Sequence, residues 1–373
     1  MEYSTDRKVY DSPDDITSVD LTIRAVSGNL SPVIYANGRN QLPVEIIAKA
    51  MKENPDGSET ILKFTAKTWL HILNLRHAES DEKLISQGSS GWCFTSFVND
   101  YSREVITGDS LTEPRYREPG DELMTLYIYT DDISTRRIAV SIDTDNGKHF
   151  TTADNSSGAE ICSVSVRAIQ PLIYRKESLI QSVVPDLGKT QVAMHYSCDD
   201  VSWAKKFDAH YDNYYFSVHN KIQNYTINNY GGDGKRDPGF PLRCAIYWRA
   251  DNHDQHILIA NPSDIPESTA TLGFHGKATW HEILAAGDST GIYDLFQTFK
   301  FNDRPATICW THFTFAASQA WELPDGRELN VNDTDLYDFD TCPWFEFHDL
   351  YGNYAAFTLR YNSTSHEIEV NQK

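Results

Sequence analysis

The chain has 373 residues, of which 40% are hydrophobic and 12% aromatic, and its formal net charge is −20 at pH 7. This hydrophobic content excludes a disordered chain. The acidic balance argues against nucleic acid or an anionic membrane as a partner, because phosphate recognition needs clustered Lys and Arg. The length predicts two or three domains, and no apolar run of about 18 residues is present to form a transmembrane segment.

The first residues, MEYSTDRKVYDSPDD, are polar and acidic and precede no apolar stretch. They do not have the pattern of a secretory signal. We assign residues 1–18 to a polar N-terminal arm. We expect a protein made in the cytoplasm without a signal peptide and either stored there, released, or incorporated in an extracellular or virion-like assembly.

The stretch from Val33 to Gly57 has the pattern of a hairpin with one buried strand. A short apolar run is followed by the polar turn ANGR, whose Asn-Gly pair can adopt the positive φ of a tight turn. The next run alternates with a period of two, which is typical of a strand with one face on a core. The residues expected on that face are Leu42, Val44, Ile46 and Ala48.

A second stretch, from Leu126 to Gly147, repeats this plan with an aromatic strand, a polar turn and an alternating strand. We therefore predict two related β-sandwich modules, residues 19–110 and a shorter partial repeat at residues 120–172. The offset between the two stretches is about the length of one immunoglobulin-like domain.

The first stretch resembles the immunoglobulin-like modules of bacterial invasin-type adhesins. The shared features are the Ala36-Asn-Gly turn, the alternating strand and the closing Asp56-Gly57. The second stretch has Thr130-Asp-Asp where the first has its Asn-Gly turn. The resemblance implies an immunoglobulin-like fold and a spacer, display or adhesion role, and it brings no catalytic residue with it. Such modules also occur in phage and tail-like structural proteins.

Two further elements are expected in this half of the chain. Val19–Val26 alternates as a strand. Leu62–Leu75 fits a helical turn capped by Thr65 and followed by a strand, although Trp69 and His71 would also alternate as part of one longer strand.

Residues 190–373 are rich in tryptophan and in short strand-like runs separated by Gly and Pro turns. This pattern predicts an aromatic-rich β-sandwich or jelly-roll-like domain. Ile283–Ala286 and Tyr293–Phe299 are the helix candidates here. The predicted fold class is therefore all-β: two immunoglobulin-like β-sandwich modules followed by a larger β-sandwich or jelly-roll-like domain with few short helices. The predicted strands are Gln191–Tyr196, Tyr214–Ile227, Leu242–Arg249, His256–Ala260, Ala306–Phe315, Trp344–His348, Ala355–Tyr361 and Glu367–Val370.

Aromatic residues near Asn, Asp and His side chains in this region are candidates for binding a sugar or a protein. The alternative is that these aromatic rings fill the core of the sandwich. The candidate binding residues are Tyr211, Tyr214, Tyr215, Trp248 and Trp344.

Two polar segments carry groups of metal-ligand type. His253 and His256 lie three residues apart beside carboxylates and could meet at a metal, but a hydrophilic hairpin loop is the simpler explanation of the segment. The second segment groups Asp333, Asp335, Asp338 and Asp340, whose carboxylates suit calcium but lack the EF-hand spacing. It is either a calcium loop or a solvated acidic loop. No other cofactor is indicated.

No catalytic motif is found. The six cysteines form no C-x-x-C pair and are expected to be reduced, and Gly88-Ser-Ser-Gly91 is not a G-x-S-x-G elbow. We expect no enzyme activity, although a hydrolase with carboxylates distant in sequence would leave no motif.

These features together favour a non-enzymatic structural or adhesion protein of a bacterial or phage-like assembly. We expect it to form a homo-oligomer, to bind assembly partner proteins, or to bind a surface. The alternatives are a lectin that binds glycans, with or without calcium, and an intracellularly stored, crystallising or toxin-type protein.

Overall fold

The computed structural model describes residues 10–105, 118–155, 158–198, 201–227, 246–251, 254–261, 269–279, 290–300, 304–316, 321–322, 328–329, 344–362 and 367–373. Within this part of the chain the fold is all-β, as predicted, and contains one α-helix. No helix among these residues has the length and apolar character needed to cross a membrane.

The chain divides into two compact units. Unit 1 comprises residues up to Leu172 together with Leu350–Asn353, and unit 2 comprises Ile173–Asp349 and Tyr354–Lys373. This division differs from the predicted one, because residues 19–110 and 120–172 lie in the same unit. Strands of both ranges pair with each other in shared sheets, so the two ranges are not separate modules.

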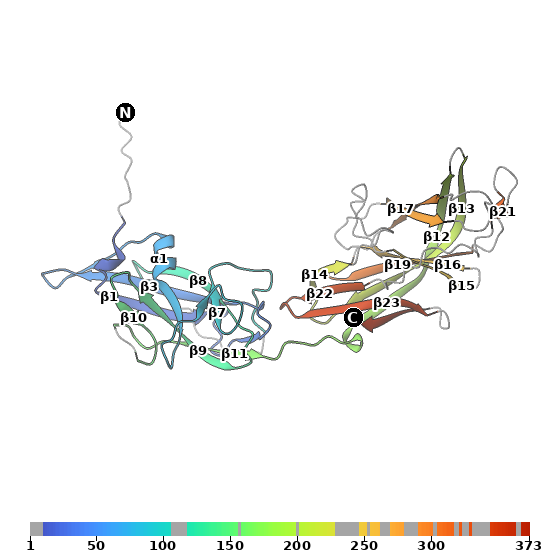
Figure 1. Ribbon diagram of the computed structural model, residues 1–373. Helices are drawn as coiled ribbons and strands as arrows, with labels where there is room; N and C mark the ends of the chain where they lie inside the picture. Colours follow the sequence, from blue (N-terminus) through green and yellow to red (C-terminus); the bar gives the residue numbers. More distant parts are fainter. Residues whose placement is uncertain are drawn as a thin grey trace, which may run out of the picture. The chain divides into compact units, whose positions relative to one another are not determined.

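Unit 1 is a sandwich of two sheets (Figure 1). Apolar side chains of both sheets, among them Ile23, Ile46, Val140 and Val166, form one continuous core. The first sheet contains β1 (Ser18–Ala25), β3 (Leu42–Glu53), β4 (Glu59–Ile61), β6 (Ile85–Ser86), β7 (Cys93–Thr95) and β8 (Glu122–Tyr129). The second contains β2 (Val33–Tyr35), β5 (Leu73–His77), β9 (Thr135–Asp143), β10 (His149–Thr151) and β11 (Val164–Ile169).

The strand β3 has an alternating sequence that buries one of its faces in the core. Leu42, Val44, Ile46 and Ala48 are all 0% exposed and face the core, as predicted from their period of two. β3 pairs on one side with β1 and on the other with β8, and both pairings are antiparallel.

The predicted hairpin at Val33–Gly57 is wrong. β2 pairs with β11 in the second sheet, whereas β3 lies in the first sheet, so the turn between them carries the chain from one sheet to the other. The second stretch makes the reverse passage, from β8 in the first sheet to β9 in the second. A period of two identifies each strand but does not specify which neighbour it pairs with.

Asn37, Gly38 and Asn40 shape the passage from β2 to β3. Gly38 adopts φ +68°, and the Asn37 carboxamide oxygen accepts from the backbone N–H groups of Arg39 and Asn40 at 2.9 and 2.8 Å. The buried Asn40 amide accepts from Tyr35 N at 2.9 Å and donates to the carbonyls of Tyr101 and Arg103 at 2.9 and 2.7 Å.

The segment Leu350–Asn353 completes unit 1 next to this turn. The Asn37 amide donates to Tyr351 O at 2.9 Å and to Asn353 Oδ1 at 3.0 Å, and the rings of Tyr35 and Tyr351 lie 5.5 Å apart, edge to face. Gly352 has φ +78°, and a Cβ there would approach Arg39 Cβ to 2.8 Å. This position therefore requires glycine.

The helix expected after Leu62 is confirmed. α1 (Ala66–Ile72) begins at Thr65, whose hydroxyl accepts from Thr68 N at 3.0 Å, and it buries Trp69 and Ile72 before the chain continues as β5. The second helix candidate, Tyr293–Phe299, is wrong, because these residues belong to the strand β18. The remaining candidate, Ile283–Ala286, lies outside the described residues.

The described part of the expected N-terminal arm is fixed to unit 1. η1 (Pro13–Asp15) is a short 3₁₀ turn, Ile16 is 0% exposed, and β1 begins at Ser18. Lys148 Nζ donates to the carbonyls of Asp14 and Ile16, both at 2.7 Å.

Unit 2 contains a seven-stranded and a four-stranded sheet. Phe216 and Trp310 of the first and Phe345 and Phe357 of the second share one aromatic core. The seven strands are β12 (Ile180–Cys198), β13 (Val201–Ser217), β15 (Ile246–Asp251), β16 (Asp254–Asn261), β17 (Thr269–Thr279), β18 (Thr290–Lys300) and β19 (Ile308–Ala316). The four are β14 (Ile222–Ile227), β22 (Trp344–Asp349), β23 (Tyr354–Asn362) and β24 (Glu367–Gln372), and β20 (Trp321–Glu322) pairs separately with β21 (Glu328–Leu329).

The predicted strands of this region correspond to β12, β15, β16, β19, β22, β23 and β24, with shifted ends. The predicted Tyr214–Ile227 strand is two strands, because β13 ends at Ser217 and β14 begins at Ile222 after a turn in which Lys221 has φ +60°. η2 (Lys176–Ser178) precedes β12.

We predict that Asn40→Ala destabilises unit 1 by about 3 kcal/mol, because Tyr35 N and the Arg103 carbonyl lose a partner and the Tyr101 carbonyl loses one of its three donors. Hydrogen exchange of the β2 and β3 amides measures this loss. The control is Asn155→Ala, because Asn155 is an exposed asparagine of the same unit. Equal exchange in the two variants would contradict the assigned role of Asn40.

Candidate functional site

The described residues contain one dense cluster of ionisable groups, on β5, β9, β10 and the turn after β5. Leu75, Val140 and Ile142 point into the core, so their neighbours Arg76, Ser141 and Asp143 lie on the outer face of the second sheet. Strand register places His149 opposite Asp143. Asp81, at φ +58°, completes the cluster.

His149 lies between two carboxylates. Its Nδ1 is 2.7 Å from Asp143 Oδ1, and its Nε2 is 2.8 Å from Asp81 Oδ2. Arg76 Nη2 reaches both oxygens of Asp143 at 2.9 and 3.1 Å, and its Nη1 donates to the Asp81 carbonyl. Lys83 adds a second cation, 3.2 Å from Asp143 Oδ2.

The surroundings of Asp143 favour its ionised form. Burial alone would raise the pKa of this carboxyl, but hydrogen bonds from His149 and Arg76, the charge of Arg76 and a hydrogen bond from Ser141 lower it from 3.8 to about 2. The side chains of Arg76 and Asp143 are 10% and 21% exposed, so solvent screens their interaction only partly.

The cluster lacks the geometry of a catalytic triad. Both ring nitrogens of His149 face carboxylates, and the nearby hydroxyls of Ser141 and Thr151 donate to Asp143 and Asp81 at 3.0 and 2.8 Å. A nucleophile activated by histidine would instead bond to a ring nitrogen. Within the described residues no three His, Cys, Asp or Glu side chains converge as a metal site. The hydrogen bonds of the cluster connect β5, β9, β10 and the turn after β5.

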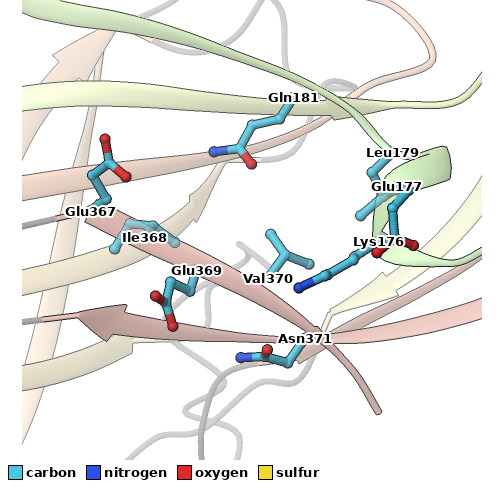
Figure 2. A pocket seen from close by; sticks show the side chains of 9 residues that line it. All are labelled: Lys176, Glu177, Leu179, Gln181, Glu367, Ile368, Glu369, Val370 and Asn371. Carbon is cyan, nitrogen blue, oxygen red and sulfur yellow. The ribbon is translucent and has the colours of Figure 1, made fainter. Parts of the chain in front are cut away.

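Unit 2 has a groove of about 470 Å³, which is the candidate binding site. Figure 2 shows Lys176, Glu177 and Leu179 of the η2 segment on one side and the strand β24 on the other. Gln181, at the beginning of β12, completes the lining. The residues contributed by β24 are Glu367, Ile368, Glu369, Val370 and Asn371.

The groove has an apolar wall and a polar rim. Leu179, Ile368 and Val370 also pack against the aromatic core of unit 2. The other six lining residues, among them Glu367 and Glu369, are exposed to solvent. Three of the rim side chains are carboxylates and one is an ammonium group, so the rim is acidic overall.

Unpaired strand edges border the groove. Among the described residues β24 pairs only with β23. β12 pairs with β13 from Ile180 onward, whereas its pairing with β18 covers only Ala193–His195. In the described part of the sheet the other edge of β12 is therefore unpaired near Gln181. Open edges of this kind accept a further strand.

The predicted binding aromatics do not come together in this groove. Tyr214 and Tyr215 are buried, with Tyr214 in the core and the Arg304 guanidinium 3.7 Å from the ring centroid of Tyr215. Tyr211 is half-buried on β13. Trp344 is half-buried, and Lys373 Nζ lies 3.3 Å from its ring centroid. Trp248 is on β15, and its side chain lies outside the described residues.

The predicted metal ligands lie outside the described residues, with one exception. Asp333, Asp335, Asp338, Asp340 and His253 are all outside. His256 is on β16, where only the backbone is described. β15 and β16 pair with each other, and Asp251 lies opposite Asp254. The two strands form the hairpin that is the alternative to a metal site in this segment.

Three cysteines have side chains that the structure describes, and all are free thiols: Cys93, Cys162 and Cys309. Burial raises the pKa of both the Cys93 and the Cys309 thiols. Both groups are therefore held as thiols, which are poor nucleophiles.

No known protein family, curated protein or solved structure matches this chain. The assignment of function therefore depends on the chain's own chemistry. Sequence reasoning missed both the ionic cluster and the groove. The one sequence pattern that points to the groove is the strand-like run Glu367–Val370. Its position at a sheet edge depends on the strand order, which the run itself does not reveal.

We predict that Asp143→Asn destabilises unit 1 by about 2 kcal/mol at neutral pH, the free energy that corresponds to its pKa shift. The folded-state pKa lies below the ordinary 3.8, so this stabilisation is fully present above that pH and is lost as the pH falls to about 2. Wild-type and variant stabilities should therefore converge in acid, as measured by urea unfolding across a pH series.

The control for this experiment is Asp145→Asn, which makes the same charge change at a side chain that is 83% exposed. It should change stability little at any pH. A constant difference between wild type and Asp143→Asn down to the lowest pH would contradict the assigned role of this carboxylate.

Proposed function

We propose that this protein is a non-enzymatic structural or adhesion component that self-associates or binds a surface through strand pairing. The observation that carries the proposal is the groove of unit 2, where unpaired edges of β12 and β24 border an apolar wall. Backbone N–H and C=O groups on such edges pair with an added strand, and an apolar wall packs the side chains of that strand.

The chemistry of the ionic cluster also supports a structural role. Its carboxylates, histidine and hydroxyls bond to each other in an arrangement that suits stability rather than turnover. The resemblance of the Val33–Gly57 pattern to invasin-type modules points in the same direction, towards display or adhesion in a bacterial or phage-like assembly.

The lectin alternative receives less support from the aromatic residues. Stacking on a sugar needs an exposed ring face. Tyr214 and Tyr215 are buried, and the ammonium group of Lys373 lies over the ring of Trp344. A glycan array separates the two functions: selective glycan binding that is abolished by Trp344→Ala would favour the lectin.

Light scattering coupled to size-exclusion chromatography tests the proposal. We predict that the average mass of the full chain rises with protein concentration, because open edges pair by mass action. A mass equal to that of one chain, 42.4 kDa, at every concentration would exclude self-association.

A further inference from the structure

We propose that β24 is a self-complementary dimerisation edge, on which a second copy of the chain adds its own β24 antiparallel about a two-fold axis through Val370. This inference rests on the proposed self-association and specifies the strand, the register and the charges that carry it.

Among the described residues, alternate backbone groups of β24 have no strand partner. Lys373 N donates to Ala356 O at 3.2 Å, so the backbone of Lys373 faces β23. In an antiparallel ladder, residues that bond to one neighbour alternate with residues that bond to the other side. Ile368, Val370 and Gln372 therefore direct their N–H and C=O groups towards the groove.

The side chains of β24 divide between two faces. Ile368 is 4% exposed and lies in the core, and Val370 packs against that core. Glu367, Glu369 and Asn371 are exposed. Lys373 follows in the same alternation, and its ammonium group lies over the ring of Trp344. Trp344 and Asn371 are on the same face of the sheet, because both pair with Thr358.

A two-fold axis at Val370 makes the exposed charges complementary. In this register Val370 faces Val370 of the other copy, Ile368 faces Gln372, Glu369 faces Asn371 and Glu367 faces Lys373. The last pair occurs twice by symmetry. Opposite charges directly across two strands stabilise the pairing, whereas like charges weaken it.

Other registers are less favourable. An axis at Glu369 places this carboxylate against itself, and an axis at Ile368 places Glu367 against Glu369. Each puts like charges opposite one another. An axis at Asn371 pairs Glu369 with Lys373 but sets only residues 370–372 of β24 opposite each other, whereas the axis at Val370 sets residues 368–372 opposite each other. The charges and the longer overlap therefore select the axis at Val370.

The groove provides the access that this pairing requires. It runs along β24 from Glu367 to Asn371, and an added strand lies about 4.8 Å from its neighbour. Among the described residues β24 has no second strand partner. As Figure 2 shows, the side chains of Ile368 and Val370 line the groove on this strand, so they would contact an incoming strand.

Charge reversal tests the register. Glu367→Lys and Lys373→Glu each replace two attractive pairs by two repulsive ones and should raise the dimer dissociation constant about tenfold. The double variant E367K/K373E restores opposite charges and should return the constant to within a few-fold of wild type. Sedimentation velocity of the full chain measures these constants, and far-UV circular dichroism with thermal melting shows that each variant is folded.

The matched control is Glu369→Lys, the same charge change two residues away. Glu369 faces Asn371 in the proposed register, so this variant should bind nearly as tightly as wild type. Rescue by E369K/K373E instead of E367K/K373E would overturn the register.

If the wild-type chain associates and all these variants associate equally tightly, the β24 edge is overturned and the proposed self-association stands. A wild-type chain that stays monomeric at all concentrations would overturn both.

Discussion

The side-chain amide of Asn40 satisfies the backbone at the corner where the chain leaves β2 for β3. β2 belongs to one sheet and β3 to the other, so backbone groups at this corner bond partly to other segments, as Ala36 N does to Ile169 O, and partly to side chains. Asn40 is 0% exposed and bonds to Tyr35, Tyr101 and Arg103 at once. Since buried backbone groups must be paired, this side chain supplies partners to backbone groups where the chain passes between the two sheets of unit 1.

The two polar features of the molecule have opposite physical characters. In the cluster around Arg76 and Asp143, donors meet acceptors within the same unit, which stabilises the fold. Along the outer edge of β24, in the part of unit 2 that the structure describes, backbone groups lie beside open space and face no other strand. A paired group contributes to stability and an unpaired edge is available to a partner, which is why we propose β24 as the recognition site.

Sequence reasoning identified elements that local pattern determines. β3 was predictable because its apolar residues alternate over a long run, and α1 because Thr65 caps it. The pairing of β2 with β11 was not predictable, because the partners are joined by a long intervening chain. Arg76, Asp81, Asp143 and His149 come together only through sheet register. The helix prediction at Tyr293–Phe299 failed because Tyr293, Leu295 and Phe299 fit the period of a strand as well as that of a helix.

The return of Leu350–Asn353 to unit 1 has a consequence for the order of folding during synthesis. Asn37 bonds to Tyr351, which is 314 residues further along the chain. At ribosomal rates of roughly 5–20 residues per second, these two residues are made about 15 to 60 seconds apart. Unit 1 is the first unit to be translated, yet its last four residues are made only after most of unit 2. Until then the amide of Asn37 lacks these acceptors, and a chain stopped at residue 172 never acquires them.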